Sequence, residues 1–172
     1  AAPEERLGHA AAPSMTLIEN TLMTSHSDDI VNKWGIINFD NVKEETKDIV
    51  SEFDVRTPTL DNAAASLSGG NLQKFVIGRE ILKKPRVFVV NQPTWGVDAA
   101  AAAFIRQSIL NLASHDSAVV VISQDLDELF EICDTFAVLT NGRLSKSYDI
   151  RSLSSEDVGL LMGGSDLDLK NP

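Results

Sequence analysis

The sequence has little of what several protein classes require. Its single cysteine, Cys133, excludes an intramolecular disulfide, and a reducing compartment fits that composition. No apolar run approaches the roughly 20 residues that cross a bilayer, and no basic stretch followed by an apolar one opens the chain, so we expect neither a membrane span nor a signal peptide. Lys and Arg number 15 against 25 Asp and Glu, a net charge of −10, which argues against a nucleic-acid surface.

What is present suffices for one folded domain, or for one domain with an appendage. The 172 residues are 43% hydrophobic, enough for a buried core. A charged leader over 1–13 precedes a part that is helical by pattern over 14–84. Its helices are expected at 14–23, where Thr16 and Glu19 form a capping box, and at 40–53, where an apolar stripe faces a charged one. Trp34, Ile36 and Ile37 are possible core anchors between them.

Strands and helices alternate in the second half, over 85–172. The apolar run Val87–Val90, between two prolines, predicts a strand that is buried on both faces. Asn141-Gly142 predicts a tight hairpin turn. The further elements expected are helices at 99–113, 125–132 and 155–162, strands at 118–122 and 135–139, and a loose tail over 165–172. This alternation is typical of an α/β fold with a parallel sheet and flanking helices.

The stretch Leu67–Lys74 is the most informative for function. Ser68 stands where a helix begins, and Gly69 and Gly70 allow a ligand to approach the backbone closely. Free amides, the positive end of the helix dipole and a hydroxyl together can bind a phosphate. A plain serine-capped helix start with glycines in a turn fits the same three residues, and the motif alone does not separate the two interpretations.

The motifs that follow in order make the chain resemble the ATP-binding cassette family. Its signature motif is similar to Leu67–Gln73, its Walker B strand and following acid to Val87–Gln92, its D-loop to Gly96–Asp98, and its switch-histidine loop to Ile122–Asp125. The resemblance implies a partial P-loop ATPase fold, with a helical subdomain followed by a mostly parallel sheet. It also implies that Asp98 lies near a dimer interface and that the signature contacts ATP held by a partner cassette through Ser68, Gly69, Gly70, Asn71 and Gln73.

Three further segments are similar to importers of simple sugars and nucleosides, in which two cassettes are fused in one chain. They are Pro3–Gly8, Asn71–Lys74 and Leu161–Gly164. The chain resembles the back part of the second cassette, and Glu4 then falls near the Q-loop, which couples nucleotide to the permease. The partners implied are a second cassette and transmembrane permease subunits, with no nucleic acid, at the cytoplasmic face of the inner membrane.

The positions that the family uses for catalysis are altered here. Asn91 replaces the aspartate that helps to hold magnesium, Gln92 the glutamate that polarises the attacking water, and Gln124 the switch histidine. An amide cannot accept a proton at neutral pH, and the loss of a general base costs about 10²–10⁴ in rate. We therefore expect no intact metal site and poor hydrolysis at this chain's own site. In the plain alternative, Asn91 and Gln92 simply end a strand. Trp95 stands where these importers commonly have arginine, without an assignable role.

The sequence contains no Gly-x-x-x-x-Gly-Lys-[Ser/Thr] loop, the phosphate cradle of the family. We expect a soluble fragment that binds neither ATP nor Mg²⁺ alone, whose parent uses both. Two other classes stay open: a non-hydrolysing regulatory cassette that stabilises a dimer, and a chromosome-maintenance ATPase, which the lack of heptads and of a basic face disfavours.

His9, His26 and His115 lack metal-ligand spacing and are expected at the surface, and Cys133 is expected to be a buried, inert thiol.

Overall fold

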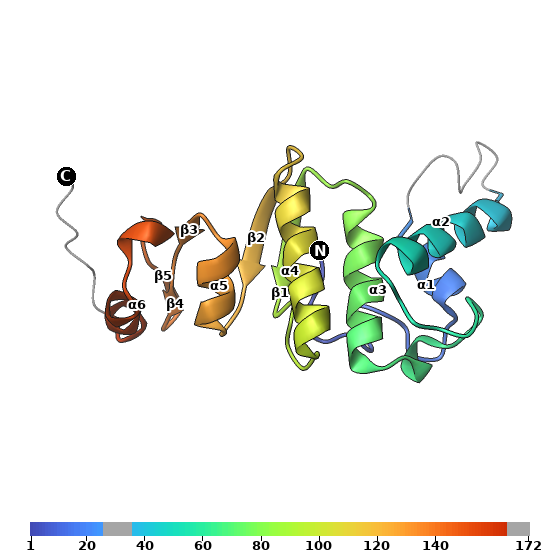
Figure 1. Cartoon of the computed structure of the whole chain (residues 1–172), viewed down its shortest axis with the longest axis horizontal. Coiled ribbons are helices and arrows are strands. Elements are labelled where there is room, and N and C mark those ends of the chain that lie inside the picture. The colour runs from blue at the N-terminus through green and yellow to red at the C-terminus, as the bar shows by residue number, and fades with distance from the viewer. Residues whose placement is uncertain (26–35, 165–172) are drawn as a thin grey trace. The chain divides into compact units, whose positions relative to one another are not determined.

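A computed structural model describes residues 1–25 and 36–164. Trp34, His26 and the tail predicted over 165–172 lie outside the described residues. The prediction that Ile36 and Ile37 anchor the core is wrong, because their side chains are 63% and 38% exposed. The chain divides into two compact units, Ala1–Gln124 and Asp125–Pro172 (Figure 1). The division predicted at residues 13 and 84 concerns subdomains of the family's cassette and stays a prediction.

The helical part of the first unit begins as the sequence predicts. Helix α1 (Leu17–Leu22) starts at a capping box, in which Thr16 Oγ1 accepts from the Glu19 amide at 3.1 Å and Glu19 Oε2 accepts from the Thr16 amide at 2.7 Å. Helix α2 (Phe39–Glu52) buries its apolar stripe, and its Val42 packs against Ile18 of α1. A 3₁₀ turn, η1 (Ala64–Ser66), then leads into α3 (Gly69–Ile81).

Two parallel strands follow α3. Strand β1 (Val87–Asn91) pairs with β2 (Ala118–Ile122), with Asn91 opposite Ile122, and α4 (Ala99–Ala113) joins them. The leader adds one bridge on the other edge of β1, because the Ala2 amide donates to Val89 O and the Asn91 amide to Ala2 O, both at 2.9 Å. Strand β1 is therefore bonded on both edges where it ends, which fixes the loop that follows.

The prediction that both faces of β1 are buried is wrong for the described structure. Phe88 and Val90 are fully buried, but Val87 is 62% exposed and, on β2, Val120 is 49% exposed. An unbroken apolar run shows that both faces of a strand are apolar, but it does not show what covers them. Nothing in the described part of the chain covers the face that carries Val87.

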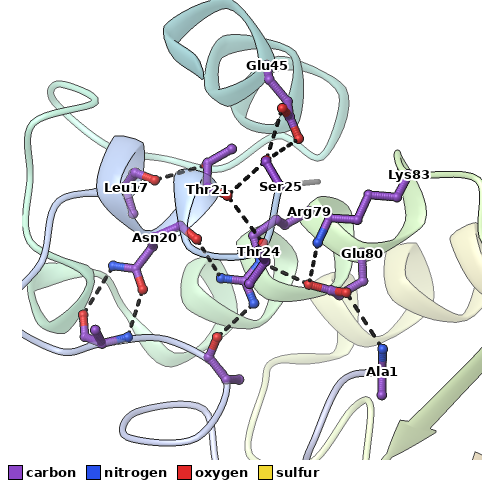
Figure 2. A network of polar contacts seen from close by, with 12 residues as sticks. Ala1, Leu17, Asn20, Thr21, Thr24, Ser25, Glu45, Arg79, Glu80 and Lys83 are labelled. Atoms are coloured by element: carbon purple, nitrogen blue, oxygen red, sulfur yellow. Dashed lines mark hydrogen bonds and ion pairs between the residues drawn. The ribbon is translucent and has the colours of Figure 1, made fainter. Parts of the chain in front are cut away.

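A buried arginine fixes α3 to the segments before it. Arg79, 3% exposed, donates to Ala10 O at 2.7 Å and to Asn20 O at 3.1 Å, and its Nε donates to Glu80 at 3.1 Å (Figure 2). Burial lowers the pKa of Arg79 from its usual value, while Glu80 favours its charged form. Two of these contacts, to Ala10 O and Asn20 O, hold this end of α3 against the preceding segments.

The second unit is built from short elements. Helix α5 (Leu126–Ile132) is capped by Asp125, and α6 (Ser155–Met162) follows the 3₁₀ turn η2 (Ile150–Ser152). The Asn141-Gly142 hairpin is confirmed: both residues have positive φ, 48° and 73°, between β4 (Leu139–Thr140) and β5 (Arg143–Leu144). The strand predicted over 135–139 is wrong in extent. It forms β3 (Thr135–Phe136), which pairs with β6 (Tyr148–Asp149), and then β4, because each half has its own antiparallel partner.

Candidate functional site

Ser68 forms the exposed start of α3. Its backbone is extended, with φ −62° and ψ 155°, and its Oγ accepts from the Asn71 amide at 3.4 Å and from Asn71 Nδ2 at 2.9 Å. The Asn71 side chain is fixed in turn, because its Oδ1 accepts from the Arg56 amide at 2.9 Å. The hydroxyl thus accepts twice within the turn, so that its proton is what it can offer to a ligand.

Gly69 and Gly70 are the first two residues of α3, where amides have no partner within a helix. Neither has a positive φ. A Cβ at Gly70 would lie 3.5 Å from Asp98 Oδ2 and 3.6 Å from Ala101 Cβ, which is ordinary van der Waals contact. The fold of the described chain therefore does not require glycine at position 70, and a reason for it has to lie outside the fold.

Asp98, the predicted D-loop residue, lies beside this turn. It caps α4, and its Oδ1 accepts from the Ala101 amide at 2.9 Å. That hydrogen bond lowers the pKa of Asp98 from its usual value, and the carboxylate is exposed. The structure thus brings Gly70 and Asp98 together although 28 positions separate them in the sequence.

Gln73 has a different setting from its neighbours in the motif. It is 2% exposed, and its Nε2 donates to Pro93 O at 2.7 Å, which ties α3 to the loop after β1. Its Oε1 is buried without a hydrogen-bond partner within the described residues. Ser68 and Gly69 are open to solvent, whereas the Gln73 side chain faces inward.

Asn91, Gln92 and Gln124 lie at the carboxyl ends of the two parallel strands, the edge where ligands bind in α/β folds. Gln92 is buried, its amide donates to Ile122 O at 2.7 Å, and its φ is +50°. A left-handed conformation costs a non-glycine residue on the order of 1–3 kcal/mol and is found at functional sites. Asn91 is half-buried and Gln124 is exposed.

The remaining candidates carry less chemistry. Glu4 and His9 are exposed on the leader, and His115 is exposed just after α4. Burial raises the pKa of the half-buried Cys133 thiol. Over residues 1–25 and 36–164, no three His, Cys, Asp or Glu side chains are grouped to hold a metal ion. In the same residues, no helix is long and apolar enough to cross a membrane.

Sequence reasoning missed Arg6, which contacts the candidate site directly. Its guanidinium donates to Gly69 O at 3.0 Å and to Trp95 O at 2.6 Å. A single arginine in a charged leader belongs to no period or spacing that would single it out. The Trp95 side chain itself is 65% exposed, so it is not a core aromatic in the described structure, and a place at an interface stays a prediction.

Curated relatives match nearly the whole chain, although no protein-family model does. This chain is 32% identical to the nucleoside import ATP-binding protein NupA of Lactococcus lactis over 165 residues, which are 96% of this chain and 33% of that protein. It is also 32% identical to the guanosine import ATP-binding protein NupO of Bacillus subtilis (95% and 32% covered), and 33% identical to the galactose/methyl galactoside import ATP-binding protein MglA of Mannheimia succiniciproducens (90% and 30%). The chain spans about a third of the length of these relatives.

Solved structures share the fold. The TM-score is 0.67 with the cassette MJ0796 in a dimeric post-hydrolysis state bound to ADP and Pi, at 16% identity over 88% of this chain and 64% of that one. It is 0.72 with an inward-facing putative metal-chelate type ABC transporter, at 18% identity over 94% and 63%. The motif order, the relatives and the fold agree, and the chain belongs to the ATP-binding cassette family, as a homologue of the ATP-binding subunits of nucleoside and sugar importers.

Proposed function

We propose that this chain belongs to the ATP-binding subunit of an importer for sugars or nucleosides, and that its Ser68–Gly70 turn contacts the ATP bound by a partner cassette. The observation that carries the proposal is the turn itself: an exposed hydroxyl and the first amides of α3 lie together, next to a glycine that the fold does not require. The relatives support the substrate class, since their names specify import of nucleosides, guanosine and galactose.

The turn acts on a phosphate through dipoles and hydrogen-bond donors that are already in place. The Ser68 proton and the amides of Gly69 and Gly70 bind phosphate oxygens, and the positive end of α3 stabilises their charge. In the proposed arrangement, the ATP that this turn contacts is held, with its Mg²⁺, by the partner cassette. Asp98 lies at the same face and takes part in the contact between the two cassettes.

This chain's own strand-end site hydrolyses ATP poorly. Asn91 offers magnesium a neutral oxygen, and neither Gln92 nor Gln124 can act as a base. If this is correct, Gln92→Glu together with Asn91→Asp raises basal ATP turnover at this site at least tenfold.

The experiment that tests the proposal is Ser68→Tyr in the complete transporter, with ATP turnover as the readout. The bulky ring blocks the turn without entering the core, because Ser68 is exposed. We expect turnover to fall at least tenfold. The matched control is Ser155→Tyr, since Ser155 is also an exposed serine at the first turn of a helix, α6, but not part of the motif.

The second candidate, a non-hydrolysing regulatory cassette, is favoured by the three amides at positions 91, 92 and 124. It predicts that Ser68→Tyr leaves turnover unchanged and weakens only the association of the cassettes. In both functions the chain lies at the cytoplasmic face of the membrane beside permease subunits, with Glu4 near the coupling loop. Purification of the complex through a tagged permease tests that placement.

A further inference from the structure

We propose that Arg6 is a positioning residue, which fixes the Ser68–Gly70 turn against the loop over residues 93–98. The inference rests on the proposed function for its effect on turnover, but the contact itself belongs to the described structure. Arg6 comes from the leader, which pairs with the edge of β1 through Ala2. One side chain thereby joins three segments that are far apart in the sequence.

The guanidinium spans two backbone carbonyls. Its Nη1 donates to Gly69 O at 3.0 Å and its Nη2 to Trp95 O at 2.6 Å, across 63 and 89 positions of sequence. Both bonds are charge-assisted, and the planar fork of arginine holds two acceptors in one geometry. The backbone of Arg6 is itself held, because its carbonyl accepts from the Ala11 amide at 2.7 Å. The backbone from which the guanidinium extends is therefore held in place.

Two glycines make room for this fork. A Cβ at Gly69 would lie 2.9 Å from Arg6 Nη1, and one at Gly96 would lie 3.0 Å from Nη2. The first distance is shorter than real Cβ contacts and the second is tighter than most, so a side chain at either position would push the flexible end of Arg6 away from its carbonyls. Gly96 also has a φ of +63°, which independently favours glycine, whereas Gly69 has no such need. The signature glycine at position 69 thus serves the contact with Arg6.

The position of the contact explains its effect. Gly69 O directly follows the Ser68 cap, and Trp95 O lies three residues before Asp98. Gln73 Nε2 already joins α3 to Pro93 O at 2.7 Å in the interior. Without Arg6, this inner bond remains and the turn can move about it, so that the phosphate donors lose their alignment while the fold persists. Small misplacements of binding groups are known to cost up to about 10²-fold in rate.

The first test needs only this chain. In a Trp34→Phe background, Trp95 is the one tryptophan, and its nanosecond anisotropy reports the motion of its loop. We expect Arg6→Met to at least double the amplitude of the fast decay of Trp95 anisotropy. The measurement is made in buffer without urea, where the chain is folded. Arg6→Lys should increase this motion almost as much as Arg6→Met does, because one ammonium cannot bridge the carbonyls of Gly69 and Trp95. The control is Arg143→Met, which replaces an exposed arginine on β5.

The second test measures ATP turnover in the complete transporter. We expect Arg6→Lys to lower kcat about tenfold while KM for ATP changes less than threefold, because the partner cassette still holds the nucleotide. Unchanged Trp95 anisotropy in both Arg6 variants overturns the contact, and normal turnover of Arg6→Lys where Ser68→Tyr is inactive overturns the positioning role. If Trp95 gains mobility in the Arg6 variants but turnover stays normal in both Arg6→Lys and Ser68→Tyr, the proposed function fails and the contact stands.

Discussion

Gly70→Ala separates what the turn does for the fold from what it does for a ligand. The added methyl carbon would lie 3.5 Å from Asp98 Oδ2 and 3.6 Å from Ala101 Cβ, so that the native structure accommodates it without displacement. The position is the second of α3 and has an ordinary negative φ. A substitution that the chain itself tolerates is the most direct probe of an external requirement for glycine.

The expected change in stability is small and positive. Alanine is favoured over glycine within helices by about 0.5–1 kcal/mol, and the first turn lies at the lower end of that range. With an m-value on the order of 2 kcal/mol/M, the urea midpoint of the first unit should rise by about 0.2–0.4 M. Turnover, in contrast, should fall at least tenfold, since the methyl crowds the amide that approaches the phosphate.

The assay pairs urea unfolding with ATP turnover. Tryptophan fluorescence follows the first unit, which contains Trp34 and Trp95 in its sequence, and the single tyrosine, Tyr148, follows the second. The control is Gly159→Ala in α6, where a Cβ would meet nothing within 4 Å. It should stabilise the second unit similarly without affecting turnover. The reasoning is refuted if Gly70→Ala retains full turnover or lowers the midpoint of the first unit.

Three further predictions concern stability. Gly78→Ala should destabilise the first unit by about 1–3 kcal/mol despite its better helix propensity, because the new Cβ would lie 2.5–3.0 Å from three atoms of the Phe53 ring; urea unfolding measures this. Arg79→Met should cost about 2–4 kcal/mol in the same assay, since two buried carbonyls lose a charged donor; a loss below about 1 kcal/mol would contradict the network. Arg151 lowers the pKa of Asp149 from 3.8 to about 2. Between pH 3.8 and about 2 the unfolded state therefore binds more protons than the folded state. The stabilisation by the Asp149–Arg151 pair is thus present above pH 3.8 and lost as the pH falls toward 2. Asp149→Asn should remove this pH dependence from the acid unfolding followed by Tyr148 fluorescence.

Features that depend on near neighbours in the chain could be predicted from the sequence. The capping box at Thr16, the Asn141-Gly142 hairpin and the helix start at Ser68 each rest on contacts within four residues, which the local residue types specify. The order of motifs likewise required no coordinates to indicate the family. Their roles in catalysis, including those of Gln92 and Gln124, stay proposals.

Contacts between distant segments were decided only by the tertiary structure. It turns Gln73 inward to Pro93, leaves Val87 exposed, and places Arg6 between two glycines that are 27 positions apart. Neither composition nor periodicity carries this information, because a side chain's partners across 60 or more positions depend on how whole elements pack. The sequence by itself determined the local caps and turns and the family that the motifs resemble. The packing determined which of these residues meet, since hydrogen bonds and burial are properties of positions in space.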